Sequence, residues 1–195
     1  MLPMLDWFLA GGPTMVPLVL ASVLALTLIF ERLLALRAER VLPAALRALT
    51  PETLPRVAPD ALAKSPLGRL LAVAQTRGPG DGLRRALEQQ AALELQGLER
   101  YLTLLGILAM ITPLLGMLGT VLGMIDVFSS LDALEGGAGA LLAGGIGAAL
   151  ISTATGLTIA IPALMAHRLL SRRVDELMNT LENCLGPWLQ PEPSP

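Results

Sequence analysis

The chain has little charge and almost no cysteine or histidine. Of its 195 residues, 15% are charged, one is cysteine and one is histidine, while 53% are hydrophobic and the mean hydropathy is +0.64. Soluble domains carry about 25% charged residues, so this composition favours a membrane protein. The single cysteine, Cys184, excludes a disulfide framework and any cysteine-based metal site, and we expect it to be structural or incidental.

The motifs of nucleotide-dependent and metal-dependent enzymes are also missing. The sequence has no Walker phosphate-binding loop, no dinucleotide fingerprint and no metal-binding pair. We therefore expect no enzyme, no cofactor and no bound metal, and an ATP-driven transporter would need its motor on another chain. The net charge of −2, with bases interspersed among acids, gives no case for nucleic-acid binding.

Three long segments carry no charged residue at all: 11–30, 101–125 and 136–166. They contain 20, 25 and 31 residues, and a helix of roughly 20 residues crosses the hydrocarbon core of a bilayer. The sequence therefore predicts an all-α membrane protein with three transmembrane helices. The first segment is expected to be a retained helix rather than a signal peptide, because no base precedes it and Glu31 and Arg32 follow directly.

Basic residues are confined to two parts of the chain. Of the fourteen Lys and Arg residues, eleven lie in 31–100 and three in 168–173, while 1–30 and 129–140 have none. Because cytoplasmic loops carry the excess of Lys and Arg, this distribution predicts an N-terminus outside and a C-terminus in the cytoplasm.

Proline and glycine mark the remaining boundaries. Pro51, Pro55, Pro59 and Pro66 exclude a long helix there and predict a linker or short turns. A helix from Gly82 to about Phe128 would continue past Pro113, and the last helix is expected to continue into the cytoplasm until Gly186-Pro187. Three transmembrane helices are predicted, at 14–37, 98–128 and 141–166. An outer amphipathic segment (1–13) precedes the first, a cytoplasmic helical loop (38–97) follows it, and an outer connection (129–140) joins the second to the third. A cytoplasmic helix (167–187) and a disordered tail (188–195) end the chain.

Small residues recur at four-residue spacing in the second and third apolar segments. Such residues let membrane helices approach closely, because lipid offers little hydrophobic drive for association. The pattern predicts tight packing, either between these two helices or between subunits. The residues are Gly119 and Gly123 on one helix, and Ala148, Ser152, Gly156 and Ala160 on the other.

Threonines form a second pattern. Thr112, Gly116 and Thr120 share one face of the second helix, and Gly145, Ala149 and Thr153 share a face of the third. Their hydroxyls either bond the carbonyl one turn back or form polar rings inside a pore. Neither 101–125 nor 136–166 contains a titratable acid, base or histidine, so a proton pathway here would need a titrating group from a partner.

Together these segments have a recognisable pattern. TPLLGMLGTVLGMI, followed by GGIGAALISTATGLTIAIPALMAHRLLSRRVDEL, resembles the MotA/TolQ/ExbB proton-channel family, with the three-helix topology of the ExbB and TolQ branch. The resemblance implies a homopentamer around a pore that holds the helices of an ExbD- or TolR-like partner, whose aspartate carries the proton. It also implies a bacterial inner-membrane location and energy transfer from the proton-motive force to a TonB- or TolA-like protein, for outer-membrane transport or maintenance.

The resemblance assigns roles to individual residues. Thr120 corresponds to the pore threonine of the GTV motif and Thr153 to that of the TA-x-GL motif, while Pro113 and Pro162 match the two helix prolines and are expected to kink their helices. Ala148 departs from the family, because ExbB and TolQ commonly have glutamate there, although the stator branch also lacks it. The expected pore-lining set is Thr112, Gly116, Thr120, Ala148, Ala149 and Thr153, and the expected packing set is Gly119, Gly123, Ser152 and Gly156.

Other interpretations stay open. The chain is alternatively a non-conducting membrane scaffold or a stator-like ion-channel subunit, and a pore would accept proton or sodium. An intramembrane enzyme is disfavoured because no Ser/His, paired-acid or metal constellation lies in the apolar segments. His167 is either an interfacial histidine or a proton-exit group, and Asp126 is either a solvated helix-end acid or part of an ion entry.

Overall fold

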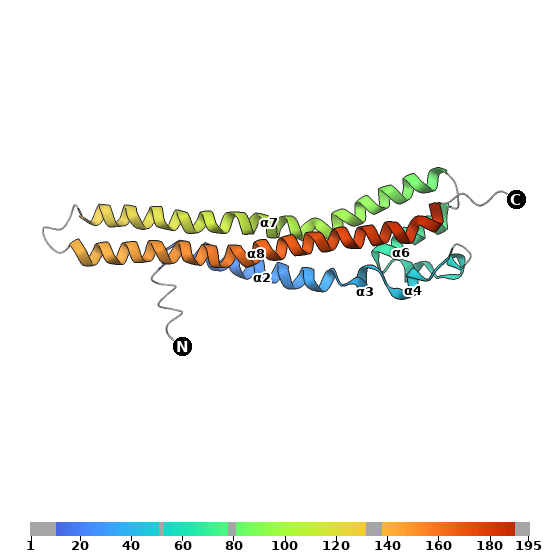
Figure 1. The fold of residues 1–195 in the computed structure, drawn as a ribbon, viewed down its shortest axis with the longest axis horizontal. Helices are drawn as coiled ribbons and strands as arrows, with labels where there is room; N and C mark the ends of the chain where they lie inside the picture. The colour runs from blue at the N-terminus through green and yellow to red at the C-terminus, as the bar shows by residue number, and fades with distance from the viewer. Residues whose placement is uncertain (1–10, 51–52, 78–80, 132–137, 190–195) are drawn as a thin grey trace. The chain divides into compact units, whose positions relative to one another are not determined.

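The computed structural model describes residues 11–50, 53–77, 81–131 and 138–189, and within these ranges every regular element is a helix. Three helices are long: α2 (Met15–Ala35), α7 (Asp81–Leu131) and α8 (Ala138–Leu189) (Figure 1). Each is long and apolar enough to cross a membrane. The described chain therefore fits the all-α membrane protein that the sequence predicted.

The segment after α2 is broken into short pieces, as its prolines predicted. They are α3 (Ala38–Val41), α4 (Ala44–Arg47), the 3₁₀ turn η1 (Leu54–Arg56) and α5 (Pro59–Leu62). The twelve-residue α6 (Pro66–Arg77) then forms, because Pro66 occupies the first turn, where its missing N–H costs no hydrogen bond. Sequence analysis did not identify α6 as a separate helix.

Helices α7 and α8 are longer than expected. The predicted helix 82–128 is confirmed and extends to 51 residues, passing Pro113 without interruption. The predicted end of α8 at Gly186-Pro187 was wrong, since the helix continues to Leu189. Leu185 is buried, so packing favours helix at the position where the local glycine signal predicted its end. The predicted segment 1–13 and tail 188–195 lie largely outside the described residues, as do 132–137 of the predicted connection 129–140. The rest of that connection is helical, because α7 ends at Leu131 and α8 begins at Ala138.

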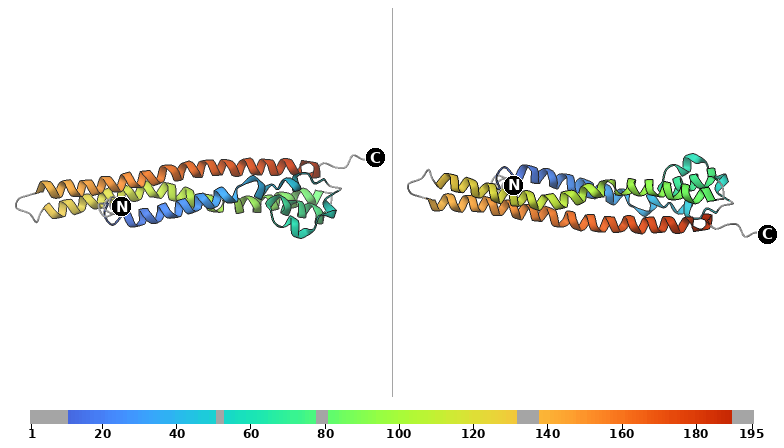
Figure 2. Two further views of the ribbon diagram at one scale, coloured as in Figure 1. Left: turned by 90° about the horizontal axis from the view of Figure 1, so that it is seen from below. Right: turned by 90° about the horizontal axis from the view of Figure 1, so that it is seen from above.

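The chain divides into two compact units. The first comprises Met1–Phe30 and Thr103–Arg168, and the second comprises Glu31–Leu102 and Leu169–Pro195. In the first unit, the described part of α2 lies beside α7 and α8, which run antiparallel (Figure 2). Gly12, with φ of 73°, forms the turn before α2, a backbone conformation that suits glycine.

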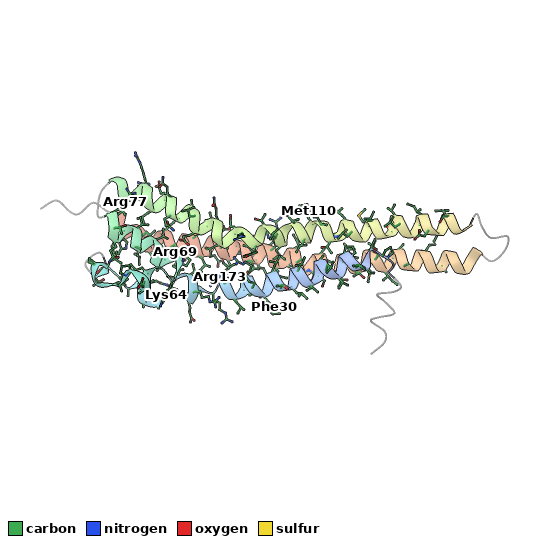
Figure 3. The ribbon with its side chains drawn as sticks, turned by 180° about the vertical axis from the view of Figure 1, so that it is seen from behind. Phe30, Lys64, Arg69, Arg77, Met110 and Arg173 are labelled. Atoms are coloured by element: carbon green, nitrogen blue, oxygen red, sulfur yellow. The ribbon has the colours of Figure 1, made fainter. Side chains whose placement is uncertain are left out.

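The two units have different surfaces and interiors. In the first unit, large apolar side chains such as Met110, which is 72% exposed, project outward (Figure 3). Such a surface suits lipid rather than water. In the second unit the buried residues include the leucines Leu62, Leu67, Leu70 and Leu71, around which charged side chains are exposed.

Candidate functional site

Helices α7 and α8 approach closely in the first unit because glycine faces glycine. A Cβ placed on Gly156 would lie 2.8 Å from the Thr112 carbonyl oxygen and 3.1 Å from Gly116 Cα. A Cβ on Gly116 would lie 3.0 Å from the Ser152 carbonyl oxygen. Both contacts involve backbone, which cannot move aside as a side chain can, so any larger residue would separate the helices locally.

Two further glycines of the packing set also face α8. A side chain at Gly119 would overlap the Ser152 hydroxyl, and a Cβ at Gly123 would lie 3.3 Å from Ala149 Cβ. All four residues expected from sequence to pack therefore lie where α7 meets α8. Gly116, which sequence analysis placed in the pore-lining set, lies there too.

The threonine hydroxyls make two kinds of hydrogen bond. Thr153 Oγ1 donates to the Gly116 carbonyl oxygen at 3.1 Å and so links α8 to α7. Thr112 donates to the Leu108 carbonyl and Thr120 to the Met117 carbonyl, within α7. No hydrogen bond joins the hydroxyls of Thr120 and Thr153 among the described residues, so each contributes separately to the surface.

Burial separates the expected pore-lining residues into two groups. Thr112 is 1% exposed and Ala149 is 4% exposed, and Gly116 is also buried inside the first unit. Thr120, Thr153 and Ala148 are half-buried. Only this second group is accessible to a partner without separating α7 from α8.

A contact between hydroxyls, which the sequence analysis missed, ties α2 to α8. Thr14 Oγ1 lies 2.9 Å from Ser152 Oγ, and both residues are buried, at 6% and 0% exposure. Thr14 also donates to the Gly11 carbonyl at 3.4 Å. The only sequence signal was the pairing of Ser152 with the small Gly119, which leaves room for the hydroxyl.

A small cavity lies at the same end of the first unit. Its volume is about 100 Å³, and it is lined by the turn before α2, by α7 and by α8. Asp126 is the one charged residue in the lining, and Ala148 and Gly145 contribute from α8. The structure thus brings Ala148 and Asp126 to one cavity, which the sequence analysis did not foresee.

His167 packs tightly near the other end of the first unit. A Cβ on Gly106 would lie 3.1 Å from the imidazole ring, so glycine makes room for the histidine. The Nδ1 atom is buried and has no hydrogen-bond partner among the described residues.

The second unit is held by charged contacts as well as leucines. Arg69 Nε donates to Glu94 Oε1 at 2.7 Å, and Gln90 Nε2 donates to the same oxygen at 2.7 Å. Burial acts to raise the pKa of Glu94, but the hydrogen bonds from Arg69 and Gln90 and the Arg69 charge outweigh it, so this pKa lies below its ordinary value of 4.5. Glu94 precedes the expected transmembrane segment 98–128.

A buried arginine joins α2 to α7 within the second unit. Arg32 is 5% exposed, and its Nη1 donates to the Leu98 carbonyl at 3.0 Å. Its guanidinium lies 4.7 Å from the centre of the Tyr101 ring, a cation–π distance, and it also pairs with Glu31. Sequence analysis counted Arg32 only as a topological charge.

No group of three or more His, Cys, Asp or Glu side chains suited to a metal is present among the described residues. The polar groups described where α7 meets α8 are instead hydroxyls and backbone carbonyls, such as those of Thr153 and Gly116.

Comparison with known proteins agrees with these features. The model of the MotA/TolQ/ExbB proton channel family matches residues 57–183. The chain is 39% identical over 178 residues to a putative biopolymer transport protein, ExbB-like 1, of Synechocystis, covering 86% of this chain and 70% of that protein. It is 45% identical over 95 residues to exbB1 of Vibrio cholerae, covering 47% of this chain and 40% of that protein. It is 38% identical over 96 residues to TolQ of Haemophilus influenzae, covering 49% and 42% respectively.

Proposed function

Because the chain belongs to the MotA/TolQ/ExbB proton channel family, in its ExbB/TolQ branch, we propose that it is the channel subunit of an ExbB–ExbD or TolQ–TolR type complex. Five copies form a ring in the bacterial inner membrane, with the N-terminus outside and the C-terminus cytoplasmic. The ring encloses the helices of a single-span partner whose membrane aspartate carries the proton. Proton-motive force then energises a TonB- or TolA-like protein.

This proposal is supported by the hydrogen bonds that the two accessible threonine hydroxyls make. Each has its single donor hydrogen committed to a backbone carbonyl, Thr120 to Met117 and Thr153 to Gly116. A hydroxyl has one donor and two acceptor positions, so both present only acceptors to a neighbour. They therefore suit the O–H of a neutral carboxylic acid better than a carboxylate.

Because these two hydroxyls present acceptors but no donors, they support a mechanism for the ring. A partner aspartate facing the hydroxyls in a low-dielectric pore has its pKa raised and stays protonated. It ionises only where it reaches water, so proton entry from one side and release to the other bias the motion of the partner. The available energy is about 2.3 kcal/mol per charge per 100 mV.

We call the accessible hydroxyls of Thr120 and Thr153 the hydroxyl track. Its rigidity is proposed to come from the buried residues next to it. Thr112, Gly116 and Ala149 are buried between α7 and α8 and support the half-buried Thr120 and Thr153. Pro113 and Pro162 lie within the helices at this level, where we retain the predicted kinks as part of the proposal.

A second candidate is a non-conducting scaffold, and one observation favours it. Ala148 replaces the glutamate that the ExbB and TolQ branch commonly carries, and α7 and α8 already pack closely within one chain. A stator-like channel subunit is the third reading that Ala148 allows.

Reconstitution tests the proposal. The chain is purified with a single-span partner bearing a membrane aspartate, and proton flux into vesicles is measured with the chain alone, the partner alone and the complex. We expect flux only from the complex, and its loss when the partner aspartate is changed to asparagine. A stable complex without flux would favour the scaffold, and the absence of any complex would contradict the proposal.

A further inference from the structure

We propose that the cavity lined by Asp126 and Ala148 is the outer entry site for the conducted ion, a monovalent cation held beside the Asp126 carboxylate. This inference rests on the proposed function and deepens it, because it assigns a titratable group of this chain to the pathway.

The first argument is the composition of the cavity wall. The lining includes Gly119, Gly123, Gly145 and Ala148, which carry no side chain or a single methyl group, around a volume of about 100 Å³. A cavity of this size holds several water molecules, provided that polar groups are present to bond them. Asp126 and Thr14 carry the polar side chains of this lining.

The second argument is access. Asp126 is exposed in the described chain, so water and ions reach the cavity along its carboxylate. It is the first charged residue after the uncharged segment 101–125.

The third argument is the sign of the local field. Among the described residues of 101–166, Asp126 is the one charged side chain. The last turn of α7 contains no base. A concave surface of one charge sign raises the local concentration of counter-ions, so this end of the first unit attracts cations.

The fourth argument is position relative to the proposed track. Asp126 lies six residues beyond Thr120 on α7, about 9 Å along the helix axis. It shares a face with Gly119, which immediately precedes Thr120. The proposed site is therefore displaced from Thr120 by about 9 Å along the helix axis and lies on the neighbouring helix face.

Flux in the reconstituted complex tests the assignment, with Asp126→Asn, Asp126→Glu and the control Asp175→Asn. Asp175 is an exposed aspartate of α8 in the second unit. We expect Asp126→Asn to lower flux at least tenfold, Asp126→Glu to stay within threefold of native, and Asp175→Asn to match native. Flux within twofold of native in Asp126→Asn, or an equal loss in Asp126→Glu or Asp175→Asn, would overturn the assignment.

A relocated acid provides a sharper test of the cavity itself. Asp126→Asn combined with Ala148→Glu moves the carboxylate across the same cavity, and flux should recover above that of Asp126→Asn alone. A double variant that assembles but whose flux stays at that of Asp126→Asn would contradict the cavity assignment. If the double variant does not assemble, the flux of Asp126→Glu tests the assignment, with the outcomes given above.

Two imposed gradients show whether the conducted ion is a proton or sodium. Flux through the native complex separates failure of the proposed function from failure of the Asp126 assignment. An imposed proton gradient and an imposed sodium gradient are compared, and the one that drives flux through native complex must also be the one lost in Asp126→Asn. A native complex without flux in either gradient overturns the proposed function and this inference together. Native flux that survives Asp126→Asn overturns this inference alone.

Discussion

The two units of the chain solve the problem of helix packing in different ways. In the first unit, α7 and α8 meet through glycine backbone and single hydroxyls, such as Gly116, Gly156 and Thr153. In the second unit, contacts depend on buried leucines and on the Arg69–Glu94 ion pair. The first arrangement suits lipid, where apolar side chains gain little by burial, and the second suits water.

The comparison indicates which unit can carry the proposed channel function. The first unit presents the half-buried Thr120 and Thr153 beside exposed apolar side chains, whereas leucines fill the interior of the second unit. The proposed track therefore belongs to the first unit.

The largest expected effect is the removal of a leucine from the second unit. Leu70 is fully buried, so Leu70→Ala should cost about 2–5 kcal/mol of local stability. Met110→Ala in the first unit should cost under about 0.5 kcal/mol, because Met110 is 72% exposed. Amide hydrogen exchange of the full chain in lipid should show faster exchange in α6 for the first variant only. Equal effects would contradict the contrast between the units.

An added methyl group should have the next largest effect. Gly156→Ala places a Cβ 2.8 Å from the Thr112 carbonyl oxygen and should cost about 1–3 kcal/mol. Gly144→Ala on the same helix meets nothing within 4 Å and should stabilise by about 0.5–1 kcal/mol through helix propensity. Exchange rates in the first unit report both changes, and a tolerated Gly156→Ala would show that the close approach is dispensable.

Acid should produce the smallest change. The pKa of Glu94 is lower in the folded chain than its ordinary value of 4.5, so the stabilisation is fully present above pH 4.5 and is lost as pH falls through the lowered pKa. Because the Arg69 side chain is 42% exposed, we expect only about 1 kcal/mol. Exchange of α6 should accelerate on acidification in the native chain but not in Glu94→Gln. The same pH response in both would exclude this ion pair.

Much of the fold was predictable because its signals are local. Uncharged length predicted α2, α7 and α8, and proline spacing predicted the broken segment after α2. The end of α8 at Leu189 was not predictable, because the burial of Leu185 depends on tertiary contacts that no local pattern encodes.

The candidate site was predictable in its residues but not in their arrangement. Four-residue spacing identified Gly119 with Gly123 on one helix and Ser152 with Gly156 on the next, which requires only helix periodicity. The assignment of Thr112 to the buried interior depends on which face of α7 meets α8, and the Thr14–Ser152 contact joins residues 138 positions apart. Such contacts require the assembled unit.

The most direct test of the central claim is proton flux through the reconstituted complex with Thr120→Val and Thr153→Val, which keep side-chain shape but remove the hydroxyl. Thr158→Val is the matched control, since Thr158 is exposed and bonds only the Ala154 carbonyl of its own helix. The account predicts that flux falls at least tenfold in the first two variants and stays at the native level in the control. Native flux in Thr120→Val and Thr153→Val would contradict the hydroxyl track and identify both threonines as packing residues.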